Sequence, residues 1–324
     1  MMDKALLLTD GKAGHENQSK ALARALGLDF DMAKIAFASP LAKAASYAFD
    51  RCGVLSTSVF ADKKGSDVQS VAELATRKGV YRAVIGTGSG CFYAAKVLAG
   101  KLGTRCAVVL YPRGYSLSGF DCILAPSFDR PASRPNVVEI PANIVPNDAA
   151  YYEERVEAFR RHYAETCGRR IADGVKASSV VIGGPNKSAT MTADWMRERL
   201  DAIFAEKDGE LWVTTSRRTP PEVEAVVDSY PWDYRLIYSR DKFNPIPAFV
   251  SLSTRLYVTA ESTGMLSEAC TCGSAKVVAL DNLRPGNHKF RRFVDGLAKG
   301  GYVGGSAKID LSRQFAQAKA LLAL

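Results

Sequence analysis

The sequence lacks long hydrophobic runs, has no paired cysteine motif and contains few histidines, and each absence excludes a class of protein. No apolar run approaches the roughly 18 residues of a membrane-spanning helix. The run Ala5–Leu8 is also too short for a signal-peptide core. The seven cysteines are dispersed and odd in number, which is typical of a reducing compartment. We therefore expect a cytoplasmic protein, and leave open a peripheral contact with the inner face of a membrane.

Metal, nucleic-acid and common nucleotide motifs are missing too. Cys270 and Cys272 are the only close cysteine pair, and no further ligand stands at zinc spacing. No aromatic and basic pattern of the RRM kind occurs, so nucleic acid is not expected as a partner. The glycine turns lack the spacing and acidic residue of a dinucleotide fingerprint, and no glycine precedes Lys187 as a P-loop requires. We expect neither a metal nor a cofactor.

Length and charge suggest two domains and an anionic partner. A chain of 324 residues exceeds the size at which one core usually keeps growing, so two domains of roughly 150 residues are expected. The net charge is +9, from 43 basic and 34 acidic residues that are scattered along the chain. Nucleotide diphosphates and anionic lipids both fit this balance.

Short apolar runs alternate with helix-like stretches, which is the βαβ rhythm of a parallel sheet. The rhythm fills residues 1–147, stops at a charged amphipathic stretch, 148–174, and restarts over 175–310. We interpret 148–174 as a linker helix. The end, 311–324, is predicted to be a helix that packs back toward the junction. The sequence therefore predicts two doubly wound α/β domains.

Three glycine-rich turns, each after an apolar run, are the most informative motifs: 10–15, 86–90 and 183–188. A glycine turn between a strand and a helix leaves backbone N–H groups free at the positive end of the helix dipole, where phosphates bind. His15 lies in the first turn. A free imidazole titrates near neutrality and could take a proton from a sugar hydroxyl, although a loop hydrogen bond is the plainer interpretation. Asp10, at the strand end, could act as the base or cap the turn.

Two segments of the second half carry candidate phosphate and ribose ligands. Ser216, Arg217 and Arg218 stand at a strand end before a proline-initiated helix, where hydroxyl and guanidinium groups can clamp a diphosphate; a surface basic pair is the alternative. Ser262 or Thr263 fits a helix N-cap without any ligand. Glu268, one to two turns further, could accept hydrogen bonds from ribose hydroxyls.

These motifs resemble a known family. Residues 10–19, 216–220 and 244–269 are similar, in the same order, to the family named after a plant mitochondrial-fission (elongated mitochondria) protein, whose bacterial members are classed as glycosyltransferases. A looser similarity joins the chain to the transferase that adds N-acetylglucosamine to the lipid-linked peptidoglycan precursor. The resemblance implies a GT-B fold: two Rossmann-like domains facing a central cleft, with the donor nucleotide in the C-terminal half.

The resemblance also implies roles for individual residues. It places His15 where the acceptor hydroxyl would be activated, and the donor phosphates at a helix N-terminus. The implied donor-side residues are Gly183, Gly184, Ser262, Thr263, Gly264, Met265 and Glu268, and the implied acceptor-side loop residues are Gly11, Gly14, Gly86, Gly88 and Ser89. Phe128 stands where the family pattern has histidine, and Glu261 where it has aspartate. These departures leave a catalytic role for the loop at Phe128 in doubt.

We therefore expect a metal-independent glycosyltransferase that moves a sugar from a nucleotide diphosphate to a hydroxyl of a lipid-type or saccharide-type acceptor of the cell envelope. Helix dipoles, backbone N–H groups and arginine can stabilise the departing diphosphate without a metal. Two alternatives stay open. A nucleotide-sugar 2-epimerase would use the same frame without an acceptor, and a membrane-associated scaffold would use it without catalysis.

Overall fold

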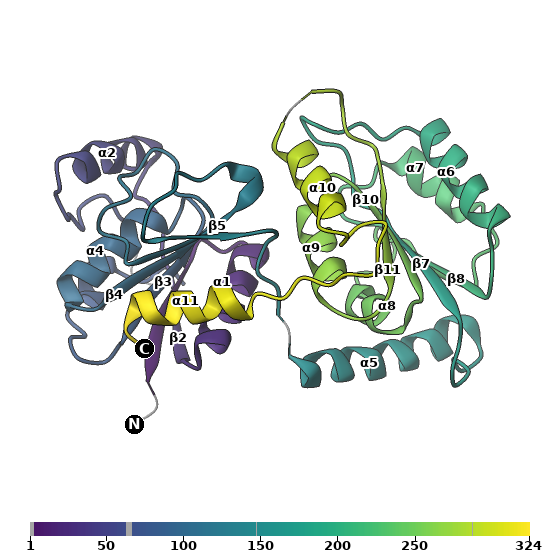
Figure 1. Ribbon diagram of the computed structural model, residues 1–324, viewed down its shortest axis with the longest axis horizontal. Coiled ribbons are helices and arrows are strands. Elements are labelled where there is room, and N and C mark those ends of the chain that lie inside the picture. The colour runs from purple at the N-terminus through teal and green to yellow at the C-terminus, as the bar shows by residue number, and fades with distance from the viewer. Residues whose placement is uncertain (1–2, 63–66, 147, 287) are drawn as a thin grey trace. The chain divides into compact units, whose positions relative to one another are not determined.

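The computed structural model describes residues 3–62, 67–146, 148–286 and 288–324. The chain divides into two compact units, Met1–Pro146 with Asp310–Leu324 and Asn147–Ile309. Each unit contains one parallel sheet with helices packed on it (Figure 1). The predicted fold class of two parallel-sheet α/β domains is confirmed. Asn147, the predicted end of the first domain, lies outside the described residues.

The sheet of the first unit has six parallel strands in the order β2-β1-β3-β4-β5-β6. They are β1 (Lys4–Thr9), β2 (Asp29–Lys34), β3 (Ala83–Thr87), β4 (Arg105–Val109), β5 (Cys122–Pro126) and β6 (Val137–Ile140). Strands β3 and β5 are buried along their whole length. This burial is typical of parallel strands that are covered on both faces, and it explains their continuous apolar sequences.

The helices of the first unit begin and end at local signals. They are α1 (Ala13–Leu26), α2 (Pro40–Arg51), α3 (Val71–Leu74), α4 (Phe92–Leu102) and α11 (Ser312–Leu322). Ser39 caps α2 by accepting the Ala42 N–H at 3.1 Å, and α1 ends at Gly27 in the left-handed conformation. Helix α11 packs on α1, β5 and β6, so the C-terminal segment completes the first unit.

The sheet of the second unit has five parallel strands in the order β11-β10-β7-β8-β9. They are β7 (Ala177–Val181), β8 (Glu210–Thr214), β9 (Tyr234–Leu236), β10 (Arg255–Thr259) and β11 (Lys276–Leu280). Its helices are α5 (Ala149–Cys167), α6 (Ala193–Ala205), α7 (Pro221–Asp228), α8 (Ile246–Leu252), α9 (Thr263–Thr271) and α10 (Lys289–Lys299).

Helix α5 comes from the segment that we interpret as a linker. It packs on α8 inside the second unit. Phe159 of α5 is fully buried, and its ring contacts those of Trp212, Tyr234 and Phe249. Aromatic burial of this kind is a large contribution to a core, so α5 is an integral helix of the second unit.

Some local expectations from the sequence are wrong. The turn 183–188 does not lead directly into a helix, because α6 begins only at Ala193, after a bridge between Asn186 and Ala189. Helices α8 and α10 are not anticipated by the sequence analysis.

Candidate functional site

The strand order of each sheet defines one point at which successive connections leave in opposite directions. Ligands of open α/β sheets bind at the carboxyl ends of the strands beside such a switch point. In the first unit the point lies between β1 and β3, and in the second unit between β7 and β10. The glycine turns 10–15 and 183–188 follow β1 and β7, and the turn 86–90 begins with the last two residues of β3. The motifs chosen from the sequence therefore meet at these two places, each within its own unit.

An aspartate and a histidine form a pair at the switch point of the first unit. Asp10 directly follows β1, and His15 lies in the first turn of α1. His15 Nδ1 is 3.0 Å from Asp10 Oδ1, and the two side chains are 21% and 12% exposed. Because a carboxylate can only accept, Nδ1–H donates to Asp10 and Nε2 of the neutral ring keeps its lone pair. This is the arrangement of a general base and the carboxylate that orients it.

The charge of Asp10 is maintained by its neighbours. Burial by itself raises the pKa of Asp10, but hydrogen bonds from Lys12 and His15 outweigh it and hold this pKa below its ordinary value. Lys12 Nζ lies 2.8 Å from Asp10 Oδ2. Asp10 is therefore ionised at neutral pH and can stabilise a proton taken up by His15.

The loop after β3 closes on this pair. Gly88 has a φ of +80°, and a Cβ there would lie 2.3 Å from His15 Cε1. A Cβ on Gly90 would lie 2.8 Å from Asp10 Cβ. Only glycine allows both the backbone conformation and this close approach. The backbone of Gly88 therefore packs directly against the His15 imidazole, and the backbone of Gly90 packs against the Asp10 side chain.

The other predicted loop residues of the first unit lie at the same edge of the sheet as Asp10 and His15. Gly11, with a φ of +81°, donates its N–H to Thr9 Oγ1 at 2.9 Å. Ser89 Oγ accepts from Lys43 Nζ at 3.1 Å. Gly14 is inside α1, and Gly86 is inside β3. The structure thus brings all of them to the β1 and β3 ends of the sheet.

A buried carboxylate lies at the switch point of the second unit. The Glu261 side chain is 0% exposed. Its Oε1 accepts from the Gly184 N–H at 2.7 Å and from Thr259 Oγ1 at 3.2 Å, and its Oε2 accepts from Asn282 Nδ2 at 2.8 Å. The Gly183 N–H donates to Thr259 Oγ1 at 2.8 Å. The two glycine N–H groups expected to be free for a phosphate are therefore engaged by side chains that follow or end β10.

Arg218, one of the two arginines predicted to bind a diphosphate, lies near the Glu261 carboxylate. Arg218 Nη2 is 3.9 Å from Glu261 Oε1, and the Arg218 side chain is 43% exposed. Its backbone is held in a turn in which the Arg218 N–H donates to Ser216 Oγ at 3.3 Å. Thr219 Oγ1 donates to the Gly183 carbonyl at 2.6 Å and ties the turn to the glycine loop. Arg217 is exposed on the same turn.

Helix α9 begins beside this cluster with an open N-terminus. Ser262 is the N-cap residue, is buried, and its side chain makes no capping hydrogen bond. Thr263, Gly264 and Met265 form the first turn, and a Cβ on Gly264 would meet no atom within 4 Å. The backbone N–H groups of such a turn lack partners within the helix. The α9 terminus thus combines donor groups with free space for an anion.

Glu268 lies further along α9 and contacts α5. Tyr152 donates its hydroxyl to Glu268 Oε1 at 3.1 Å. Burial raises the pKa of Glu268 to about 7. The carboxyl group therefore changes its charge near neutral pH. Its predicted contact with ribose hydroxyls stays a prediction.

One functional-looking group escaped the sequence analysis. The ring of His162 stacks on Phe243 at 4.2 Å between centroids, and its Nε2 pairs with Asp241 Oδ2 at 2.8 Å. Its Nδ1 lies 3.0 Å from the Tyr234 hydroxyl. These contacts fix the loop after β9 to α5. The wide separation of the four residues in sequence hides this cluster.

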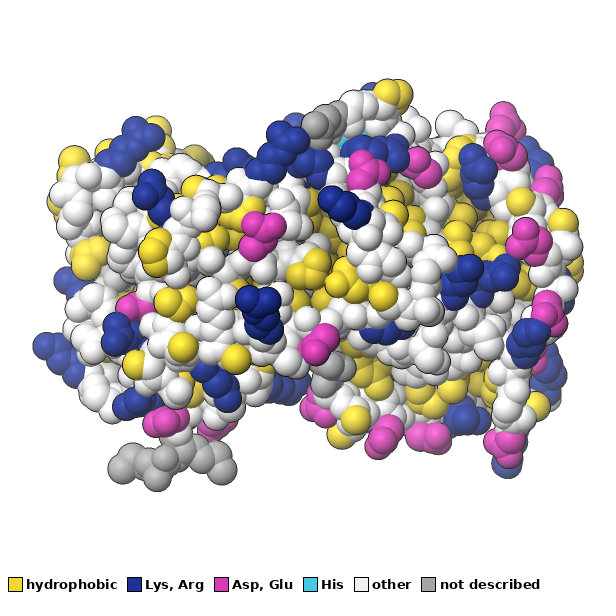
Figure 2. Space-filling view, in the orientation of Figure 1, with side chains coloured by type: hydrophobic (Ala, Val, Ile, Leu, Met, Phe, Trp, Pro, Cys, Tyr) yellow, Lys and Arg dark blue, Asp and Glu magenta, His cyan; other side chains and the backbone are white. Residues whose placement is uncertain are grey.

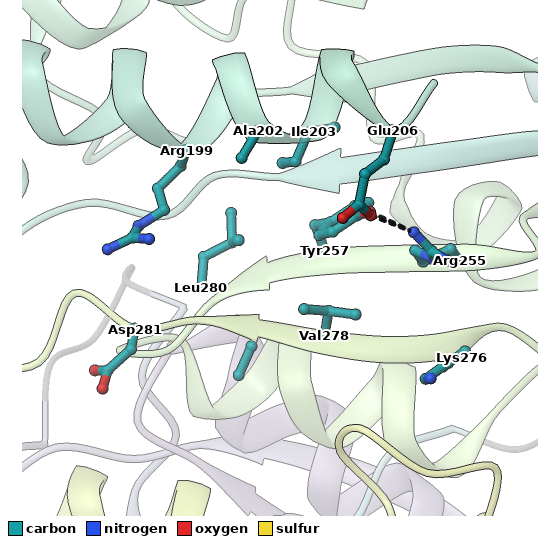
Figure 3. Close-up of a pocket in the computed structure, with 11 residues that line it drawn as sticks. Arg199, Ala202, Ile203, Glu206, Arg255, Tyr257, Lys276, Val278, Leu280 and Asp281 are labelled. Atoms are coloured by element: carbon teal, nitrogen blue, oxygen red, sulfur yellow. Dashed lines mark hydrogen bonds and ion pairs between the residues drawn. The ribbon is translucent and has the colours of Figure 1, made fainter. Parts of the chain in front are cut away.

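A separate hollow lies between α6 and the strands β10 and β11, with a volume of about 510 Å³ (Figure 3). Its carboxylates are paired, Glu206 with Arg255 at 3.0 Å and Asp281 with Arg291 at 2.8 Å. Lys276 begins β11, at the amino end of the strand, so much of this hollow faces away from the switch point. Among the residues that the structure describes, no three His, Cys, Asp or Glu side chains come together as a metal site.

The sequence model described as "Mitochondrial fission ELM1" matches residues 13–314. Among curated proteins, none matches the sequence. Within the described residues, no helix is both long and apolar enough to cross a membrane.

Solved structures of similar fold cover nearly the whole chain at low identity. The UDP-GlcNAc 2-epimerase from Methanocaldococcus jannaschii is 12% identical with a TM-score of 0.51, over 92% of each chain. The UDP-GlcNAc 2-epimerase from Neisseria meningitidis bound to UDP-GlcNAc is 13% identical with a TM-score of 0.51, over 99% of this chain and 91% of that one. The glycosyltransferase SnogD from Streptomyces nogalater is 13% identical with a TM-score of 0.48, over 99% and 91%. The fold is GT-B.

Proposed function

We propose, from the premise that this chain belongs to the mitochondrial fission ELM1 family and has a GT-B fold, that it transfers a sugar from a nucleotide diphosphate to a hydroxyl acceptor. The observation that carries the proposal is the Asp10–His15 pair at one switch point, with an open helix terminus and an arginine at the other. A base for an acceptor and a cradle for a diphosphate are the two requirements of this reaction.

The second unit would bind the donor. The N-terminus of α9 offers backbone N–H groups and the positive end of the helix dipole to the diphosphate. Arg218 would add an exposed cation, and Glu268, further along α9, would accept hydrogen bonds from ribose hydroxyls. The structural neighbour from Neisseria was solved with UDP-GlcNAc, which makes a UDP-sugar the first donor to test.

The first unit would activate the acceptor. His15 Nε2 takes the proton from the acceptor hydroxyl, and the oxygen forms a bond to the anomeric carbon. The bond from that carbon to the diphosphate oxygen breaks, and the diphosphate leaves with the electron pair. Asp10 stabilises the imidazolium, while the α9 terminus and Arg218 take up the negative charge that develops on the leaving group. No step of this scheme requires a metal.

The alternative activity is 2-epimerisation of the donor, favoured by the likeness to two epimerase structures with TM-scores of 0.51. Proton NMR of UDP-GlcNAc, recorded with the enzyme in D₂O, distinguishes the two activities. Epimerisation without an acceptor would introduce deuterium at C2 and invert that centre. Transfer predicts an unchanged C2 proton and release of UDP only when a lipid-linked or saccharide acceptor is added.

A second candidate function, docking on an anionic membrane, is favoured by helix α10. Segment 284–299 contains five basic residues and one acidic residue. On α10, Lys289 and Lys299 are exposed, while Phe293 and Leu297 are buried. Figure 2 shows blue side chains around α10. Co-sedimentation with anionic but not neutral vesicles, weakening as salt rises, would support this docking, and salt-independent binding would contradict it.

A further inference from the structure

The fully buried carboxylate of Glu261 lies close to the proposed diphosphate site of the second unit, and its charge there requires an explanation. Glu261 is fully buried, takes hydrogen bonds from three donors and lies 3.9 Å from the guanidinium of Arg218. The backbone could be fixed here by a neutral acceptor such as glutamine. The hydrogen bonds alone therefore do not explain why a negatively charged side chain stands here. Burial of an ionised carboxylate costs desolvation free energy. For this reason ionised groups are seldom buried without a role or a partner.

The charge of Glu261 acts differently on two ligands of the proposed reaction. A sugar ester of a nucleoside diphosphate carries one negative charge on each phosphate. The free nucleoside diphosphate carries one charge more at pH 7.5, because its terminal phosphate loses a second proton near pH 6. An added charge near a buried carboxylate is repelled more strongly than in water, since the intervening medium screens it less. Glu261 therefore penalises the product more than the donor.

We infer that Glu261 is a specificity-determining residue that biases the β7–β10 site toward the sugar-bearing donor and against the free nucleoside diphosphate. The inference rests on the proposed function. It also assigns a purpose to the Arg218–Glu261 contact, which keeps the cation from holding the departing product tightly. A site with arginine alone would bind the more highly charged product best and release it slowly.

The test is the substitution Glu261→Gln. Glutamine keeps the acceptor for the Gly184 N–H, and its amide can donate to Asn282, whose buried Oδ1 has no hydrogen-bond partner and is free to take the place of Nδ2. Calorimetric titration at pH 7.5 with UDP and with UDP-GlcNAc gives the ratio of the two dissociation constants. We expect E261Q to tighten UDP binding by about tenfold and to tighten UDP-GlcNAc binding by clearly less, so that the ratio changes.

Two further variants sharpen the result. Asp208→Asn removes one negative charge at the amino end of β8, where Asp208 pairs with Lys176, and should leave the ratio unchanged. The double variant E261Q/N282D moves the carboxylate to the neighbouring side chain and should return the ratio toward that of the original protein. This pair also preserves the buried hydrogen bond if E261Q alone folds poorly.

The outcomes separate the inference from the function on which it rests. If the unaltered protein binds neither UDP nor UDP-GlcNAc, the proposed function fails. If it binds both but E261Q weakens them equally, Glu261 is only an anchor of the glycine loop and the inference is overturned. An unchanged ratio in E261Q overturns it as well.

Discussion

The two units place different chemistry at the switch points of two parallel sheets whose strand orders differ. In the first unit, glycine backbone closes around a titratable pair, Asp10 and His15, whose side chains keep some exposure. In the second unit, a carboxylate with no exposure, Glu261, fixes the loops, and the outward groups are an arginine and a helix terminus. The difference teaches that a switch point supplies only a location, and that the side chains there determine its chemistry, for which we propose proton transfer in the first unit and anion binding in the second.

The largest effect should come from the first unit. His15→Gln removes the proposed base while Gly88 and its loop can remain, and we expect turnover to fall by about a thousandfold, within the range of general-base catalysis. The dissociation constant for UDP should stay the same, because the proposed donor ligands lie in the second unit. Initial rates and calorimetry check both parts. His288→Gln, on a residue that caps α10, is the control and should retain turnover.

A glycine comparison tests the packing of the second unit. A Cβ on Gly184 would lie 2.1 Å from the Arg218 carbonyl oxygen, so Gly184→Ala should lower the free energy of unfolding by about 3 kcal/mol. Gly264→Ala, where a Cβ meets no atom within 4 Å, should raise it slightly, since alanine favours a helix. Urea denaturation measures both. Equal stabilities of the two variants would contradict the tight junction described for Gly184.

The proposed anion binding by the second unit should depend on Arg218. Arg218→Gln should weaken UDP binding by about tenfold, the usual worth of one charge-assisted hydrogen bond to a phosphate. Arg197→Gln, which removes an exposed cation paired with Asp194, serves as the matched control and should change binding less than twofold. Calorimetry at fixed ionic strength compares them. A similar loss in both variants would show that only the net charge matters.

The smallest effect concerns pH. Burial raises the pKa of Glu268 to about 7, above the value of 4.5 expected for the unfolded chain. The folded state thus holds the proton more tightly, so the free energy of unfolding should fall as pH rises from about 4.5 to 7. Glu268→Gln should remove this slope and melt about 2–4 °C higher than the original protein at pH 8, a change of about 1 kcal/mol. Equal melting temperatures at pH 8 would contradict the burial of this charge.

Much of the fold could be predicted because its signals are local. Apolar runs such as the one in β3 and glycine turns after β1 and β3 report the βαβ order directly. The family resemblance, which the sequence match over residues 13–314 confirms, added the GT-B arrangement. Helix α8 was missed since it is short and proline-rich at its start, and α10 since Pro285 and Gly286 shortly before it are typical of a loop.

The candidate site was only partly predictable. Asp10 and His15 are five residues apart, so their pairing follows from one turn. The roles of Glu261 and Asn282 depend on three loops meeting at one point, and the contact of His162 with Asp241 spans 79 residues. Such contacts are set by sheet order and helix packing, and no spacing in the sequence reports them.

The most direct measurement of the central claim is a thermal-shift series with UDP, GDP, CMP and ADP and their sugars, with and without a chelator. A ligand that binds the native state raises the melting temperature by mass action. We expect a selective rise with one nucleoside diphosphate and its sugar, unchanged by chelator and reduced in Arg218→Gln. No rise with any of these ligands would contradict a nucleotide-sugar site in the second unit.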